Sequence, residues 1–266
     1  MYPRLFHLYG PLWIYGYGAM IALGFLVFLL CTINHPVRQK CLTMEQYFNV
    51  LFAGFLAAIT GGRFLFVITH LQDFEGRFFE IFYPWIGGLT LIGGVVGVLV
   101  VVPAYLFIYR IPVLPLLDVC AIYAPLMQAI ARIGCLLSGC CYGAIAGKNA
   151  FLSVVFTDPE GFCPYLHVPL LPTQLYMSLA SLLIFVTIFY FYRWARSTPG
   201  ASILLFLVLE SAARFFIDFW RGDREDLQTF LTFFGQPITL SQPQLFSLVL
   251  LVLSIIGFVW TIRKNR

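Results

Sequence analysis

The feature that most constrains this chain is a series of long apolar runs. A hydrocarbon layer about 30 Å thick takes about 20 helical residues to cross, and seven runs of about that length can be placed. They lie near residues 14–31, 47–68, 88–108, 114–137, 174–192, 201–220 and 244–262. The chain is 61% hydrophobic and 11% charged, whereas soluble domains average roughly 45–50% apolar and 25% charged residues. These patterns predict an all-α integral membrane protein with seven transmembrane helices.

The connections between the runs predict one domain, residues 1–266. They are short except for residues 138–173 and 221–243, and no internal repeat divides the chain. The fourth run contains Asp118, Pro125 and Arg132, so it is either a buried helix or a broken span. The first run lacks a basic flank and a small-residue cleavage site, and we expect it to be retained as a helix rather than removed as a signal peptide.

The basic residues in the loops predict the orientation. With the N-terminus outside, the inner side receives Arg38, Lys40, Arg110, Arg193, Arg196, Arg263, Lys264 and Arg266. The outer side receives Arg4, Arg77, Lys148, Arg221 and Arg224, together with Asp73, Glu75, Glu80, Asp158, Glu160, Asp223, Glu225 and Asp226. This bias favours an outer N-terminus, an inner (cytoplasmic) C-terminus and two long outer loops. The small positive net charge then reflects topology, and no nucleic-acid partner is expected.

Six charged residues remain within or at the edges of the apolar runs: Arg63, Arg132, Arg214, Asp118, Glu210 and Asp218. Each is costly there unless it is paired, hydrated or functional. Pairing would suit Asp118, and Glu210 with Arg214 at spacing i, i+4. A guanidinium keeps its charge and matches phosphate in shape, so the arginines are alternatively sites for an anionic headgroup. Neighbouring glycines fit close helix packing, or a backbone that lines a ligand cavity.

Three cysteines lie close together in residues 131–143, "ARIGCLLSGCCYG". Their C-x4-C-C spacing matches no usual zinc or iron–sulfur pattern, so we expect neither a metal nor another cofactor. A disulfide from Cys135 to Cys140, or to Cys163, stays open because this end faces the oxidising side in the predicted topology. Packing as small apolar residues is the favoured interpretation.

Six ordered segments carry a resemblance to a known family. They are "YGYGAMIALGF" (15–25), "AGFLAAITGGR" (53–63), "IGGLTLIGGVVGVL" (86–99), "ARIGCLLSGCCYG" (131–143), "PTQLY" (172–176) and "ARFFIDFWR" (213–221). In order and spacing they resemble the prolipoprotein diacylglyceryl transferases of bacterial inner membranes. The resemblance runs over nearly the whole chain.

This resemblance implies a multi-pass enzyme of the bacterial cytoplasmic (inner) membrane that performs the first step of lipoprotein maturation. Such an enzyme moves a diacylglyceryl group from phosphatidylglycerol to the lipobox cysteine thiol of a preprolipoprotein signal peptide. Glycerol phosphate is released, and no cofactor takes part. The implied partners are therefore phosphatidylglycerol, the lipobox peptide and the surrounding membrane lipids.

The resemblance also assigns roles to individual residues. Arg132, Arg214 and the acidic Asp218 match the catalytic positions, with Arg132 holding the lipid phosphate. Binding of phosphatidylglycerol or the peptide is implied for Arg132, Tyr17, Arg63, Gly134, Gln174 and Tyr176. Fixed positive charge near a leaving phosphate lowers the barrier to its departure, so arginines suit this chemistry.

The chain also departs from the family pattern. Cys135, Ser138 and Cys140 stand where Asn, Asn and Glu are expected, and Ile92 and Leu171 stand where histidines are expected. A histidine base at position 92 is thus excluded, which leaves Asp218, Glu210, His167, a tyrosine, or electrostatic activation alone. Two functions stay open: an active transferase, or a family-fold protein with altered or lost activity that binds or transports an anionic lipid or small molecule.

Overall fold

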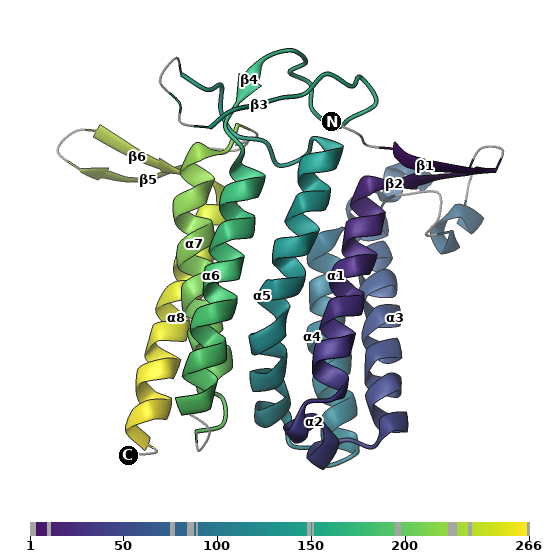
Figure 1. The fold of residues 1–266 in the computed structure, drawn as a ribbon, viewed down its shortest axis with the longest axis vertical. Coiled ribbons are helices and arrows are strands. Elements are labelled where there is room, and N and C mark those ends of the chain that lie inside the picture. The colour runs from purple at the N-terminus through teal and green to yellow at the C-terminus, as the bar shows by residue number, and fades with distance from the viewer. Residues whose placement is uncertain are drawn as a thin grey trace. The chain divides into compact units, whose positions relative to one another are not determined.

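The computed structural model describes residues 4–9, 12–74, 78–83, 88, 90–147, 150, 152–194, 198–222, 228–233 and 236–264. Each of the seven apolar runs forms a helix (Figure 1). The helices are α1 (Gly16–Ile33), α3 (Met44–Thr69), α4 (Leu91–Ile108), α5 (Val113–Ser138), α6 (Thr173–Trp194), α7 (Ala201–Ile217) and α8 (Gln242–Lys264). The fourth run is a continuous helix that passes through Pro125, so the broken span is wrong.

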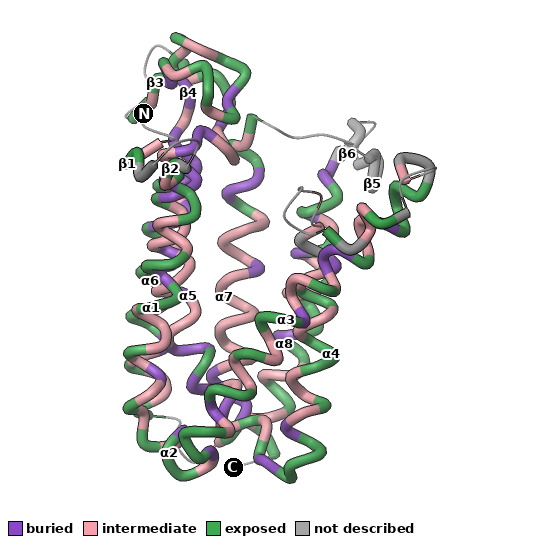
Figure 2. Tube along the Cα trace, turned by 90° about the vertical axis from the view of Figure 1, so that its right-hand side faces the viewer, coloured by how far each residue is buried: buried purple, intermediate pink, exposed green. Residues whose placement is uncertain are grey.

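Five of these helices, α1, α3, α5, α6 and α8, are long and apolar enough to cross a membrane. The apolar helix 93–108 is shorter, and α7 has 17 residues. Large apolar side chains on α4, such as Leu99, Val100 and Phe107, are exposed. Exposed stretches of the α4 trace are green in Figure 2. This surface suits contact with lipid. The described helices thus agree with a helical membrane protein, while seven spans and the orientation stay predictions.

The remaining elements are short. They are the helices α2 (Pro36–Cys41), η1 (Leu71–Phe74), η2 (Phe78–Phe82) and η4 (Asp218–Trp220), and the antiparallel pairs β1 (Arg4–Tyr9) with β2 (Leu12–Tyr15), β3 (Val154–Val155) with β4 (Pro169–Leu170), and β5 (Gln228–Phe233) with β6 (Gln236–Leu240). The two long predicted loops therefore contain β3–β4 and β5–β6. Several charges used to predict the orientation lie outside the described residues: Glu75, Arg77, Lys148, Arg196, Asp223, Arg224, Glu225, Asp226 and Arg266.

The chain divides into two compact units, and the prediction of one domain over residues 1–266 stays a prediction. Asn34–Leu116 form the second unit, in which α3 packs against α4. A Cβ atom on Gly61 would collide with the carbonyl oxygen of Gly93, and one on Gly97 with that of Ala57. These glycines therefore allow the two helix backbones to approach closely.

Met1–Ile33 and Leu117–Arg266 form the first unit. Its helix α7 packs against both α6 and α8. A hydrogen bond of 2.8 Å from the Ser178 hydroxyl to the Ala129 carbonyl joins α6 to α5. Helix α1 reaches α5 where a Cβ atom on Gly24 would lie 2.9 Å from the Met127 carbonyl oxygen. The helices of this unit are thus held together both by packing and by buried polar contacts.

Asp118 has a structural role at the start of α7. Its carboxylate accepts hydrogen bonds from the backbone N–H groups of Gly200 (2.6 Å) and Ile203 (2.9 Å). A carboxylate at a helix N-terminus satisfies free N–H groups and opposes the positive end of the helix dipole. The expected pairing with a basic side chain is therefore replaced by capping of a helix.

Replacing Asp118 should destabilise the bundle without removing a group from the functional site. Asp118→Ala leaves two N–H groups without an acceptor and should lower the free energy of unfolding by about 2 kcal/mol. Asp118→Asn keeps an acceptor and should cost less. Thermal unfolding in detergent measures both, with the exposed Glu45→Ala as control. Equal melting temperatures for Asp118→Ala and the wild type would contradict the capping role.

Candidate functional site

A polar pocket lies within the first unit, where α5, α6, α7 and η4 meet. We call it the arginine pocket, and its lining consists of Arg132, Cys141, Thr173, Gln174, Met177, Arg214, Ile217, Asp218 and Arg221. Three guanidinium groups face one carboxylate, which leaves an excess of positive charge. The structure thus brings together four of the predicted site residues, namely Arg132, Arg214, Asp218 and Gln174.

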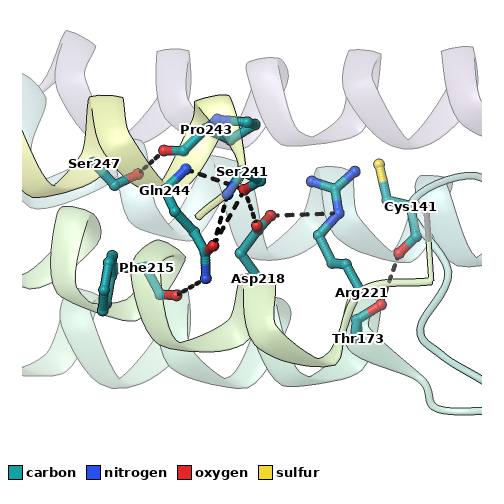
Figure 3. Close-up of polar contacts among 9 residues, drawn as sticks. All are labelled: Cys141, Thr173, Phe215, Asp218, Arg221, Ser241, Pro243, Gln244 and Ser247. Carbon is teal, nitrogen blue, oxygen red and sulfur yellow. Dashed lines mark hydrogen bonds and ion pairs between the residues drawn. The ribbon is translucent and has the colours of Figure 1, made fainter. Parts of the chain in front are cut away.

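Asp218 is the junction of a polar network (Figure 3). Its carboxylate accepts a 2.5 Å hydrogen bond from the Ser241 hydroxyl and lies 3.8 Å from Nε of Arg221. Ser241 is also the N-cap residue of α8, because it and Gln244 exchange hydrogen bonds of 3.0 and 3.3 Å that form a capping box. The one acidic side chain of the pocket therefore positions Arg221 and the start of α8.

The other two arginines carry charge that this carboxylate does not neutralise. Among the described residues, Arg214 forms no ion pair, and the expected pair with Glu210 is absent. Instead, Glu210 accepts a 2.6 Å hydrogen bond from Gln128. Arg132 reaches the sulfur of Cys135 at 4.0 Å. Half-buried guanidinium groups without carboxylate partners favour an anionic ligand, and phosphate matches their geometry.

Hydrogen bonds from α6 hold the loop after α5 against the pocket. The Thr173 hydroxyl donates to the Cys141 carbonyl, and the Gln174 amide nitrogen donates to the Cys140 carbonyl, both at 2.8 Å. Gln174 is 1% exposed, and its side-chain oxygen has no hydrogen-bond partner among the described residues. A buried acceptor without a partner is costly, so this oxygen offers a place for a donor on a ligand.

The same loop is bound to the end of η4. The N–H of Gly222 donates to the Tyr142 carbonyl at 3.0 Å, and the N–H of Ala144 donates to the Trp220 carbonyl at 2.9 Å. A Cβ atom on Gly222 would collide with the Gly143 carbonyl oxygen. This close contact brings Arg221 and Cys141 into the lining of one pocket. Figure 3 shows the Arg221 guanidinium and the Cys141 sulfur pointing in the same direction.

The sulfurs of Cys135, Cys140 and Cys141, the thiol cluster, all lie within 4.8 Å of one another. Hydrogen bonds from the Cys135 and Cys140 thiols, together with the charges of Arg221 and Arg132, hold the pKa of the Cys141 thiol well below its usual range. All seven cysteines are free thiols. The thiol of Cys163 lies apart from the cluster and donates to the Tyr165 carbonyl at 3.7 Å.

Arg63 belongs to the second unit and is occupied there. Its guanidinium donates to the backbone carbonyls of Glu80, Ile81 and Gly88. The group also lies over the rings of Phe66 and Phe74, at 5.7 and 5.3 Å from their centroids. Arg63 therefore fastens the segment after α3 to that helix, and its contact with a ligand stays a prediction.

Other predicted residues are absent from the lining of the arginine pocket. Tyr17 is exposed at the start of α1. Gly134 packs α5 against α1, since a Cβ atom there would lie 3.0 Å from Cβ of Met20 and 3.3 Å from Cα of Tyr17. Tyr176 and His167 also lie outside the lining. The side chain of Ile92 is outside the described part of the chain.

Three residues of the network were not predicted from the sequence. Arg221 was counted as a loop charge, although its i, i+3 spacing from Asp218 permits the ion pair. The Ser-x-x-Gln pattern of Ser241 and Gln244 is a recognisable capping box, but nothing in the sequence reveals that the same serine hydroxyl reaches Asp218. That contact depends on the packing of α7 against α8.

Comparison with known proteins places this sequence in a family. Residues 3–260 match the family model described as "Prolipoprotein diacylglyceryl transferase". The chain belongs to the prolipoprotein diacylglyceryl transferase family. Two relatives named phosphatidylglycerol–prolipoprotein diacylglyceryl transferase, from Clostridium tetani and Dehalococcoides mccartyi, are each 31% identical. The alignments cover 100% and 97% of this chain, and 99% and 93% of those proteins.

A third relative of the same name, from Dechloromonas aromatica, is 29% identical over 96% of this chain and 94% of its own length. Members of this family are thus similar to the chain over nearly their whole length. The predicted family resemblance is confirmed.

The contacts of Arg63 predict a loss of stability when it is replaced. Arg63→Ala leaves three carbonyl groups without their donor and should lower the free energy of unfolding by about 3 kcal/mol. Thermal unfolding and limited proteolysis of the segment after α3 measure this effect. A stable Arg63→Ala protein that no longer binds phosphatidylglycerol would contradict the structural role and support a contact between Arg63 and the ligand.

Proposed function

We propose that this chain transfers the diacylglyceryl group of phosphatidylglycerol to the lipobox cysteine of a preprolipoprotein. Membership of the family supports this reaction. The observation that carries it is the arginine pocket, in which Arg132 and Arg214 are free of carboxylate partners among the described residues. Such a pocket is suited to a single anionic group, and the headgroup of phosphatidylglycerol supplies one.

The reaction requires stabilisation of a leaving phosphate. The thiol of the substrate cysteine gives its proton to water, and its sulfur attacks the glyceryl carbon. The carbon–oxygen bond to phosphate breaks, and the electron pair stays on the phosphate oxygen. Negative charge grows on that oxygen as the bond lengthens. Fixed guanidinium groups at this position stabilise the transition state more than the ground state, and we assign this role to Arg132 and Arg214.

Asp218 is a positioning residue in this scheme. Its hydrogen bond from Ser241 and its ion pair with Arg221 hold one wall of the pocket in place. Because the carboxylate is already used in this way, it is poorly suited to accept the proton of the substrate thiol. Electrostatic activation of the thiol is then the simpler of the mechanisms left open by the sequence.

The proposed reaction also implies how the chain is oriented in the membrane. We propose seven spans in the bacterial inner membrane, with the N-terminus periplasmic and the C-terminus cytoplasmic, as the distribution of loop charges favours. The arginine pocket lies at the ends of α5, α6 and α7 that adjoin the loop 138–173. In this orientation the pocket faces the periplasmic half of the bilayer, where a preprolipoprotein presents its lipobox.

Replacing Arg132 tests the proposal directly. Membranes that contain the wild-type protein and phosphatidylglycerol should add one diacylglyceryl mass to a lipobox peptide. Arg132→Ala should slow this reaction by at least about 100-fold, because it removes a charge aimed at the leaving group. Arg193→Ala is the control, since Arg193 lies in the last turn of α6 and contacts Phe189 outside the pocket.

The absence of any mass shift with folded wild-type protein would overturn the transferase. A folded but inactive protein that still binds phosphatidylglycerol, and loses this binding in Arg132→Ala, would support the alternative of a lipid-binding or transporting relative. Cys135, Ser138 and Cys140, which stand in place of the family's Asn, Asn and Glu residues, would then mark the change of chemistry.

The unpartnered oxygen of Gln174 predicts a contribution to recognition of the lipid headgroup. A glycerol hydroxyl of phosphatidylglycerol is a hydrogen-bond donor that this oxygen can accept. Gln174→Met should therefore raise KM for phosphatidylglycerol by about 10-fold, a value typical of one lost hydrogen bond. The same assay at varied lipid concentration measures the change, and an unchanged KM would contradict a contact with the headgroup.

A further inference from the structure

The thiol cluster has features that packing alone does not require. Its three sulfurs belong to residues at the end of α5 and in the following loop, and all lie within 4.8 Å of one another. Cys141 adopts a positive φ of 55°, a conformation that is uncommon for a residue other than glycine. The chain thus takes up a costly turn at the residue that contributes the third sulfur.

The spacing of the sulfurs is close to that of a metal–thiolate site. A Zn–S bond of about 2.3 Å with tetrahedral angles separates two ligand sulfurs by roughly 3.8 Å. If the side chains of Cys135, Cys140 and Cys141 rotate so that the distances between their sulfurs shorten by about an ångström, the sulfurs reach this separation. A disulfide, in contrast, needs two sulfurs at about 2.05 Å with a restricted dihedral angle, which adjacent cysteines rarely achieve.

The surrounding charges favour such a site. Three thiolates and one Zn²⁺ ion together carry one negative charge. Arg132 lies 4.0 Å from the Cys135 sulfur, and Arg221 lines the same pocket as Cys141. These guanidinium groups offset the remaining negative charge, which is otherwise expensive to bury.

Three protein ligands leave one zinc position open, as in catalytic zinc sites. Cys141 lines the arginine pocket, so the open position adjoins the place where the lipid phosphate would bind. We propose that Cys135, Cys140 and Cys141 bind a zinc ion whose fourth ligand is the thiol of the peptide substrate. The spacing of these cysteines in the sequence argued against a metal, but the turn at Cys141 closes the three sulfurs into one cluster.

The role of this zinc rests on the proposed transferase function. Coordination to zinc deprotonates a thiol, and the thiolate is the nucleophilic form. The thiol proton passes to water, the sulfur forms a bond to the glyceryl carbon, and the bond from that carbon to the phosphate oxygen breaks. The electron pair leaves with glycerol phosphate, and the thioether product no longer binds as a thiolate. No oxidant or reductant is needed.

Metal binding is tested first, without any assay of activity. Purified protein in detergent should hold one zinc ion per chain, and replacement by Co²⁺ should give thiolate-to-cobalt charge-transfer absorption. Single substitutions Cys135→Ser, Cys140→Ser and Cys141→Ser should each weaken zinc binding at least 10-fold. Cys163→Ser is the matched control, because this buried cysteine lies in the same loop but outside the thiol cluster.

The fourth ligand is tested with the cobalt protein. A lipobox peptide should intensify the charge-transfer absorption, whereas the same peptide with serine in place of its cysteine should not. Removal of zinc with a chelator should abolish transfer, and added zinc should restore it. If the cobalt signal responds to the cysteine peptide but no transfer occurs with zinc bound, the transferase function fails while the metal site stands.

Three results would overturn the proposal. They are folded protein without zinc or a cobalt spectrum, full transferase activity in zinc-free protein, and zinc binding that survives all three serine substitutions. Mass spectrometry without reductant separates the first result from oxidation, since a disulfide within the thiol cluster lowers the mass by two hydrogens.

Discussion

The hydrogen bond between Ser241 and Asp218 is the contact on which the pocket depends. It joins the end of α7 to the first residue before α8, and the same carboxylate holds Arg221. The Ser241 hydroxyl also accepts from the backbone of Gln244, so one side chain caps a helix and fixes an acid. In an apolar bundle, a carboxylate held in this way lets an arginine be partly buried beside it while two other arginines keep their charge available.

A charged side chain within an apolar helix needs a partner, and the charges of this chain find different ones. Asp118 is neutralised by backbone N–H groups at the start of α7. Arg63 is satisfied by backbone carbonyls. Glu210 and Asp218 accept hydrogen bonds from the side chains of Gln128 and Ser241. Arg132 and Arg214 have neither a backbone acceptor nor a carboxylate partner among the described residues. The positions of these two arginines coincide with the pocket, as expected where binding of a ligand provides the missing partner.

The helices and several residues of the arginine pocket were predictable from the sequence. The apolar runs predicted all seven helices, because the length needed to cross a bilayer leaves few alternatives, and the motifs around Arg132, Gln174, Arg214 and Asp218 predicted residues that share one pocket. The roles of Asp118 and Arg63 were not predictable, because a backbone partner leaves no mark in the sequence. Nor was the approach of the three sulfurs to within 4.8 Å of one another, because the positive φ of Cys141 in this turn has no sequence signal.

The satisfaction of Asp118 and Arg63 by backbone groups also affects how the protein responds to its medium. Dissolved salt screens pairs of exposed charges, but it has little effect on hydrogen bonds between a buried side chain and the main chain. The helices should therefore tolerate changes in ionic strength well. Binding at the arginine pocket should depend on ionic strength, because dissolved anions compete with the lipid phosphate for its guanidinium groups.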